Sequence, residues 1–281
     1  MHHRNSLAGA GLTLILAVAA HAGTLPADAL PLPNRVANAE MIVVGKITSI
    51  EDKTVMVAPT PGGKKLEYRI AVITVSEALQ APKGTTKVRL GFVPPPPNVV
   101  VSPPPLIPAE GMEGCFFLTK HGEGDFYMAP SPLNFLDKKS ANFDKDLALV
   151  KRCAKILEDP DAALKGKESE DRFLAASMLV MRYTTRKTPN PKREPIAAEQ
   201  SKLILEALAA ADWTPQKDFT QLSPQMVLGR LALTDKDGWK PPAPGDAKAY
   251  AAYAQQWLKD HAATYRIERY VPDAEVKRGE K

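Results

Sequence analysis

Histidine limits the chemistry that is open to this sequence. The 281-residue chain contains five, and His2, His3 and His21 fall in an N-terminal stretch with the pattern of a cleavable signal peptide. His121 and His261 remain, and neither stands beside a recognisable nucleophile or metal-ligand partner. A Ser-His-Asp or Cys-His site needs one well-placed histidine, and a His-rich zinc site needs two or three. We expect His121 to be a solvated turn residue and His261 to suit the negative end of a helix.

Other motifs of catalysis are also missing from the sequence. It has no G-x-S-x-G elbow and no Walker loop. Asp235–Gly238 resembles the middle of a calcium loop, but that alignment places Leu233 and Pro244 at the first and last ligand positions, so the match fails. A pair of carboxylates from distant positions is still possible, as in glycoside hydrolases. The sequence therefore predicts no catalytic residue, no cofactor and no metal ligand. It favours a non-catalytic binding module, with a carboxylate-dependent hydrolase of an envelope polymer as the alternative.

A proline-rich segment is the first candidate for binding. Eight prolines stand between positions 94 and 108, and Pro94, Pro97, Pro103 and Pro105 are among them. Such a segment adopts an extended polyproline conformation and is a typical ligand of aromatic grooves. A stiff connector between two strands is the simpler interpretation, because proline cannot occupy a central strand or a helix interior.

Aromatic side chains supply two further candidates. Tyr250, Tyr253 and Trp257 recur at helical spacing, as a platform for a sugar or peptide would, although such a stripe is more often part of a core. A barrel face with exposed aromatics would bind an oligosaccharide or a single-stranded nucleic acid. The candidates for that face are Tyr68, Phe92, Phe116 and Phe126.

The N-terminus predicts export. A weakly basic start precedes the apolar run Leu7–Ala20, and Ala20 and Ala22 supply the small residues that a signal peptidase reads. The run is too short to be a good membrane span, so we expect cleavage after Ala22 and a soluble protein in the periplasm or outside the cell. The net charge of +5 is interleaved with acids, which disfavours a nucleic-acid partner. The expected partner is an unknown protein or polymer of the cell envelope.

The order of patterns along the chain predicts an α+β protein. Residues 23–37 are rich in proline and alanine and are expected to form an extended lead-in. Residues 38–136 hold about five strand candidates without a crossover helix, and Lys87–Val93 shows a clean period-2 alternation. Gly45 is the expected bend of the first strand. A sheet of this size must curl to bury its apolar face, so we predict a five-stranded OB-like β-barrel.

The second half predicts a mostly α-helical domain over residues 141–270. One apolar stripe begins it, formed by Phe143, Leu147, Val150, Ala154 and Leu157. Further helices are expected near 169–183, 197–211, 223–233 and 246–263, followed by an extended segment at Tyr265–Val271. A polar loop is expected at Arg186–Pro195, and residues 271–281 are expected to be a flexible tail.

The chain has two cysteines, Cys115 in a strand candidate and Cys153 on a helical stripe. An exported protein is able to pair them in a disulfide. Two buried thiols that act as small hydrophobic side chains are an equally good interpretation. The sequence leaves both alternatives open.

Four pieces of the β half stand in a recognisable order: NAEMIVVGKITSIE, YRIAVITVSEALQ, VRLGFVPPP and CFFLTKHGEGDFYMAP. In this order they resemble the netrin-like OB domain of the tissue inhibitors of metalloproteinases. The resemblance implies an OB barrel. Those inhibitors act through a cysteine at the mature N-terminus that binds the protease zinc, whereas the expected start here is Gly23, so no residue carries that role. Over its full length the chain also resembles exported bacterial proteins of unassigned function, which implies no residue roles.

Overall fold

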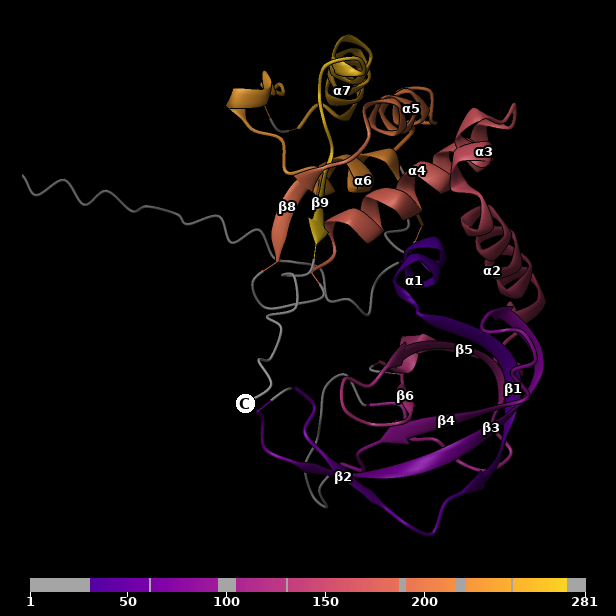
Figure 1. The fold of residues 1–281 in the computed structure, drawn as a ribbon. Coiled ribbons are helices and arrows are strands. Elements are labelled where there is room, and N and C mark those ends of the chain that lie inside the picture. The colour runs from indigo at the N-terminus through magenta and orange to yellow at the C-terminus, as the bar shows by residue number, and fades with distance from the viewer. Residues whose placement is uncertain are drawn as a thin grey trace, which may run out of the picture.

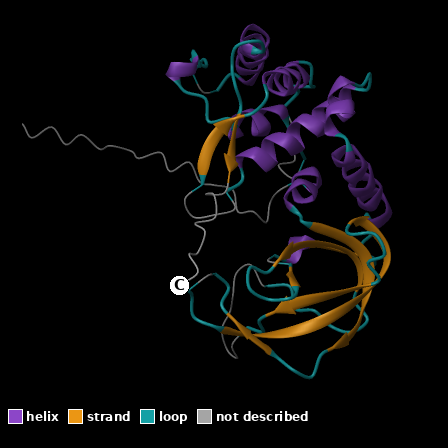
Figure 2. Cartoon of the chain, viewed as in Figure 1, coloured by secondary structure: helices purple, strands orange, loops and turns teal. Residues whose placement is uncertain are grey.

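The computed structural model describes residues 31–60, 62–95, 105–129, 131–186, 191–215, 221–243 and 245–271. The predicted signal peptide, Pro97, Pro103 and the tail beyond Val271 lie outside these ranges. The described chain divides into a barrel and a mostly helical region that follows it (Figures 1 and 2). The predicted α+β class is confirmed.

Five strands close the barrel in the order β1-β3-β4-β6-β5 and back to β1. They are β1 (Met41–Ile50), β3 (Leu66–Gln80), β4 (Lys87–Phe92), β5 (Glu113–Lys120) and β6 (Tyr127–Met128). The pairs are antiparallel except β4 with β6, where a short parallel pairing completes the closure. Two short strands, β2 (Val55–Val57) and β7 (Phe135–Asp137), extend the sheet from β3 and β5. The predicted OB-like barrel is confirmed.

Gly45 is where β1 bends. The register of β1 against β3 shifts between Val44 and Gly45, as expected at a β-bulge. A Cβ on Gly45 would lie 2.5 Å from the carbonyl oxygen of Thr74 on β3. Only glycine allows the two strands to approach this closely, which confirms the bend predicted at this position.

The barrel buries its aromatic side chains. Tyr68, Phe92, Phe116 and Phe126 are each at most 8% exposed. Phe116 and Phe92 join the main interior cluster with aliphatic residues of β1, β3 and β4, and Tyr68 packs against Phe126 at one end. None of the four is available to stack against a base or a sugar, so the aromatic platform expected on this barrel is absent at these positions.

Seven α-helices are described, six of them after the barrel. The helix α1 (Leu32–Asn38) precedes it, and the others are α2 (Phe143–Glu158), α3 (Pro160–Lys165), α4 (Ser169–Thr184), α5 (Ala198–Ala209), α6 (Pro224–Arg230) and α7 (Ala247–His261). The most buried is α4, whose residues Leu174–Met181 are all inaccessible, as its nearly all-round apolar sequence predicts. It lies at the centre of the helical region (Figure 1).

The barrel and the helices share one apolar cluster. Ile42, Cys115 and Phe117 point outward from β1 and β5 and belong to the same cluster as the buried faces of α1, α2 and α4. An ion pair of 2.7 Å between Lys151 of α2 and Glu77 of β3 lies at the same contact. One layer of the barrel wall therefore serves as the floor of the helical region.

The expected extended lead-in is corrected over its last residues, because α1 occupies Leu32–Asn38. Proline suits a first helical turn, where its missing N–H would be unsatisfied anyway, and Pro33 takes that place. Val36 and Ala37 are buried against α4 and α2. The Nε of Arg182 donates a 3.1 Å hydrogen bond to the carbonyl of Ala37. Burial against later helices decides this conformation, and the local sequence does not show it.

The predicted polar loop at Arg186–Pro195 contains a strand, β8 (Lys192–Pro195), which pairs antiparallel with β9 (Glu268–Val271). All four residues of β8 are exposed, so no apolar alternation marked it in the sequence. The extended segment predicted at Tyr265–Val271 is confirmed by β9. Among the described residues no helix combines the length and the apolar character that crossing a bilayer requires.

Candidate functional site

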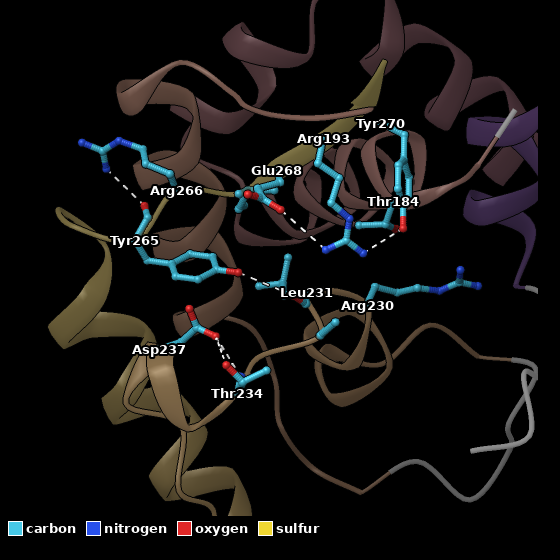
Figure 3. A pocket seen from close by; sticks show the side chains of 12 residues that line it. Thr184, Arg193, Arg230, Leu231, Thr234, Asp237, Tyr265, Arg266, Glu268 and Tyr270 are labelled. Carbon is cyan, nitrogen blue, oxygen red and sulfur yellow. Dashed lines mark hydrogen bonds and ion pairs between the residues drawn. The ribbon is translucent and has the colours of Figure 1, made fainter. Parts of the chain in front are cut away.

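Ionisable side chains converge at a pocket of about 280 Å³ that opens between the β8–β9 ribbon and the loop after α6 (Figure 3). We call it the β8–β9 pocket. Its walls carry side chains of both charges together with two phenols: Arg193, Arg230, Arg266, Asp237, Glu268, Tyr265 and Tyr270. The pocket is smaller than most sites for drug-sized ligands, so it suits a small polar molecule or the end of a larger one.

Tyr270 of β9 lies at the basic side of the pocket. Its hydroxyl oxygen accepts hydrogen bonds from Nη2 of Arg193 at 2.8 Å and from Nε of Arg186 at 3.1 Å. Both guanidinium groups also face its ring, at 4.9 and 5.3 Å from the centroid. These hydrogen bonds, that of Arg193 first, lower the pKa of the Tyr270 phenol, and its neighbouring positive charges act in the same direction.

Arg230 is the last residue of α6 and is half-buried in the pocket wall. Its guanidinium makes no hydrogen bond or ion pair with any residue that the structure describes. By contrast, Arg193 is held by Tyr270 and by a 3.5 Å ion pair with Glu268, and Arg266 donates from Nη1 to the carbonyls of Ala263 and Tyr265. Arg230 therefore keeps its donors available for a ligand.

The acidic side of the pocket is built on a tight turn. Asp237 ends a short 3-10 helix, Asp235–Asp237, and its Oδ2 accepts hydrogen bonds from both N and Oγ1 of Thr234, each at 2.8 Å. Gly238 follows with φ of 71°, a left-handed conformation that favours glycine. The carboxylate of Asp237 thus closes a turn with the backbone N–H and the hydroxyl of Thr234.

Tyr265 lies on the acidic side of the pocket, near Asp237 (Figure 3). Burial is the main cause that raises the pKa of its phenol to about 12, and the negative charges of Asp237 and Glu268 add to the effect. Its hydroxyl lies 3.5 Å from the carbonyl oxygen of Leu231, at the limit of a hydrogen bond. The pKa values of the two phenols thus shift in opposite directions, because Tyr265 is more deeply buried, with carboxylates nearby, and Tyr270 accepts hydrogen bonds from two guanidinium groups.

Ala232 supplies a strained backbone position in the wall of the same pocket. It has φ of 51°, and no other non-glycine residue among those described has a positive φ. Its N–H donates to the carbonyl of Gly229 at 3.4 Å, so it closes the C-terminus of α6, where glycine is the usual residue. Strain of this kind is often found near functional positions, and here it lies two residues from Arg230.

The predicted aromatic stripe lies beneath this pocket and supports it. Trp257 is 3% exposed and donates from Nε1 to the carbonyl of Asp237 at 3.1 Å. The hydroxyl of Tyr253 accepts from the N–H of Lys240 at 2.7 Å and donates to the carbonyl of Gly238. Together with Tyr250 these rings surround Trp239. Their contacts fit the core interpretation, and they hold the turn that carries Asp237.

The proline-rich candidates fall only in part within the described residues. Pro94 is exposed and Pro105 is half-buried at the two ends of the segment. Pro97 and Pro103 lie outside the described residues. The structure does not bring Pro94 or Pro105 into the β8–β9 pocket.

The expectation for His121 is wrong. It is 2% exposed and packs against the rings of Tyr68 and Phe126, with centroids 5.1 and 4.6 Å away. Its Nδ1 accepts from the backbone N–H groups of Glu123 and Gly124 at 3.1 and 2.8 Å. Nε2 therefore carries the proton, and it has no hydrogen-bond partner among the described residues. The hairpin folds its tip inward over the barrel, which a local turn pattern does not show.

His261 ends α7, as expected, and stacks on Trp257 at 4.5 Å between centroids. Cys115 and Cys153 are both unpaired and fully buried. Burial raises the pKa of each thiol to about 12. Of the two alternatives for the cysteines, the structure has the buried thiols. Among the described residues no group of three or more His, Cys, Asp or Glu side chains is placed to hold a metal ion.

Comparison with protein-family models gives no match, and neither does comparison with curated proteins.

The sequence alone did not predict that the residues of the pocket form a site. Arg193, Arg230 and Glu268 stand 37 and 38 positions apart in the chain, in a polar loop, at a helix end and in the closing segment. The one local signal for pairing of the polar loop with the closing segment is that both carry arginine and glutamate, because opposite charges on neighbouring strands stabilise their pairing.

Proposed function

We propose that this protein is an exported, non-catalytic binding module that holds a small ligand by an anionic group in the β8–β9 pocket. The observation that carries the proposal is Arg230, a half-buried residue of the pocket wall whose guanidinium has no partner among the described residues. A guanidinium presents its donors in a fork that matches a carboxylate or phosphate.

Arg193 supports the same function in a different way. Its guanidinium is fixed by Tyr270 on one edge and by Glu268 on the other, so it has little freedom to lose when a ligand binds. The fixed guanidinium of Arg193 and the unpaired guanidinium of Arg230 together resemble a preorganised anion site. The positive charges of Arg193 and Arg230 outweigh the one carboxylate that lies beside them, Glu268.

A carboxylate-dependent hydrolase is the less favoured alternative. Asp237 and Glu268 line the pocket and are the carboxylates such an enzyme would use there. Glycoside hydrolysis needs one carboxyl group to be protonated so that it acts as the acid. Asp237 accepts two hydrogen bonds from Thr234, and Glu268 pairs with Arg193. Both carboxylates thus have partners within the protein, and neither is placed as a free acid in the pocket.

The location and the origin of the barrel are further parts of the proposal. The signal-peptide pattern of residues 1–22 supports export to the periplasm or the exterior, where the ligand would be a small molecule or a group of an envelope protein or polymer. The four pieces of sequence quoted above and the strand order of the barrel support a relationship to netrin-like OB domains. The proline-rich segment from Pro94 to Pro105 is proposed as a secondary contact to a larger partner.

Calorimetric titration of the purified protein tests the anion site, with acetate and inorganic phosphate as probes at low ionic strength. We expect saturable binding of one of them, weakened about tenfold or more in Arg230→Gln, because a charged hydrogen bond contributes about 1.5–3 kcal/mol. Arg269→Gln is the matched control, since Arg269 is exposed on β9 and does not line the pocket. Equal affinity in wild type and Arg230→Gln, or no binding of either probe, would refute the proposal.

A further inference from the structure

The charges of the β8–β9 pocket are separated in space. Figure 3 shows Asp237 and Tyr265 on one side, Arg230 and Tyr270 on the other, and Arg193 with Glu268 between them. The head of Arg266 points out of the pocket, where it donates to the carbonyls of Ala263 and Tyr265. The site therefore has an acidic end and a basic end.

Among the residues that the structure describes, no cation pairs with the carboxylate of the acidic end. The described partner of Asp237 is Thr234, whose two donors are neutral and leave the negative charge of Asp237 uncompensated. Burial is the main cause of the raised pKa of Tyr265, and the negative charges of Asp237 and Glu268 add to it. Only Oδ2 of Asp237 is engaged by Thr234, so Oδ1 is open to a donor on a ligand.

The basic end has the opposite character. Arg186 and Arg193 share a single acceptor, the hydroxyl of Tyr270, and the phenol shows their field in its lowered pKa. Arg230 adds a third positive charge with no described partner. Glu268 is the one carboxylate among these groups, and it lies on the inner side of Arg193 (Figure 3).

We propose that the ligand of this pocket is dipolar, with an ammonium group at Asp237 and a carboxylate at Arg230. The chemical class is an amino acid whose two charged groups are separated by a short chain, or the equivalent end of a peptide. This inference rests on the proposed anion site and adds the second charge to it. Opposite charges are placed so that each end of the ligand meets its complement.

A purely anionic ligand fits the pocket less well. A dicarboxylate that satisfied Arg230 would bring its second carboxylate toward Asp237, where like charges repel across a partly desolvated space. A diamine would satisfy Asp237 but place its second ammonium beside Arg193 and Arg230. A ligand with one charge of each sign avoids both penalties. The order of affinities among three ligands of equal length is therefore a test of the inference.

The experiment uses calorimetric titration of the purified protein with 6-aminohexanoate, adipate and hexane-1,6-diamine, which share one chain length. We expect 6-aminohexanoate to bind about tenfold more tightly than either of the other two. Shorter homologues, 4-aminobutanoate and glycine, then report the spacing of the two ends. Asp237→Asn should remove the preference, because the amide keeps an acceptor for Thr234 and loses the charge.

Two controls keep the result interpretable. Glu268→Gln removes the other carboxylate of the pocket and keeps Asp237, so it provides a second variant if Asp237→Asn fails to fold. Thermal unfolding of each variant shows whether it is folded. If adipate binds as tightly as 6-aminohexanoate in an Arg230-dependent way, the dipolar inference is wrong while the anion site stands. If no probe binds, or Arg230→Gln binds all of them unchanged, the proposed function itself fails and this inference falls with it.

Discussion

The barrel and the β8–β9 pocket use the same kinds of side chain in opposite ways. In the barrel, aromatic rings such as Phe116 and Phe126 are fully buried, and the pair of Arg89 with Glu51 lies on the outer surface. In the pocket, Tyr265 and Tyr270 line an open space with arginines and carboxylates beside them. Because these aromatic rings are buried inside the barrel, they are not available to a ligand. We therefore expect the ligand to bind in the helical region.

The comparison also concerns stability. The barrel is closed by strand pairing, and its outer residues Ile42, Cys115 and Phe117 continue into the apolar cluster of the helices. The pocket stands on a two-stranded ribbon and a short turn, each with exposed residues. Substitutions in the barrel should therefore change the stability of the fold, and substitutions in the pocket should change binding.

The two cysteines offer the largest effect, because Cys115 lies in the barrel and Cys153 lies in the helical region that carries the pocket. A pKa of about 12 leaves Cys115 and Cys153 with about a thousandfold less thiolate than an ordinary cysteine, and burial also blocks access. We expect no labelling of either thiol by iodoacetamide in the native protein and labelling of both after unfolding. Because both belong to one apolar cluster, they should become reactive at the same urea concentration.

Variants with a single cysteine allow the labelling of Cys115 and of Cys153 to be followed separately. Cys153→Ala leaves Cys115 to follow the barrel, and Cys115→Ala leaves Cys153 to follow the helices. Two distinct labelling transitions would contradict the expectation and show that the regions unfold independently. A denatured, unreduced sample with fewer than two reactive thiols would contradict the unpaired state.

Phe126 gives the largest expected loss of stability. Its ring fills the end of the barrel between Tyr68 and His121, and Gly91 of β4 lies so close to it that a Cβ there would collide with the ring. Phe126→Ala should lower the free energy of unfolding by about 3–5 kcal/mol. Urea denaturation followed by circular dichroism measures this.

The pocket supplies the contrast for that measurement. Tyr270→Phe removes one hydroxyl from a half-exposed ring, so it should change the free energy of unfolding by about 0.5 kcal/mol or less. If Tyr270→Phe lowered the free energy of unfolding as much as Phe126→Ala, the pocket would be part of the structural core, and the two regions would not differ in their contribution to stability.

His121 makes the stability of the barrel depend on pH. Burial lowers the pKa of this imidazole, against the smaller opposite effect of Glu123. A folded pKa below the unfolded value means that the contribution is complete above about pH 6.5 and is lost as the pH falls through the folded pKa. Protonation would also place a hydrogen on Nδ1 against the N–H groups of Glu123 and Gly124.

The measurement is the melting temperature of wild type and His121→Asn across this pH range. Wild type should lose more stability than the variant on going from about pH 7.5 to about pH 5, because asparagine does not titrate. The Arg230→Gln variant should follow wild type, since Arg230 lies in the other region. Parallel curves for wild type and His121→Asn would show that acid acts elsewhere.

Much of the fold was readable from the sequence because its signals are local. The alternation at Lys87–Val93 and the stripe that begins at Phe143 lie within single elements, and both elements formed where they were expected. Gly45 showed its bend for a similar reason. The helix α1 and the strand β8 were missed, since α1 depends on burial against distant helices and β8 has no buried face.

The candidate site was not readable in the same way. Arg193, Arg230 and Asp237 are brought together by the pairing of β8 with β9 and by the turn after α6, and no spacing in the chain links them. The burial of His121 could not be predicted from the sequence either, because a hairpin tip that folds inward has the same sequence pattern as one that faces solvent. Tertiary contacts decide both.

Ala232 tests whether backbone strain in the pocket wall lowers the stability of the fold. An alanine with φ of 51° is destabilised by about 1–2 kcal/mol, and glycine removes that cost while it loses somewhat more entropy on folding. Ala232→Gly should therefore raise the free energy of unfolding by up to about 1 kcal/mol. Ala252→Gly is the matched control, because Ala252 is exposed within α7 and glycine in a helix interior costs about 1 kcal/mol. Opposite signs for the two variants in urea denaturation would confirm the strain, and a loss of stability in both would contradict it.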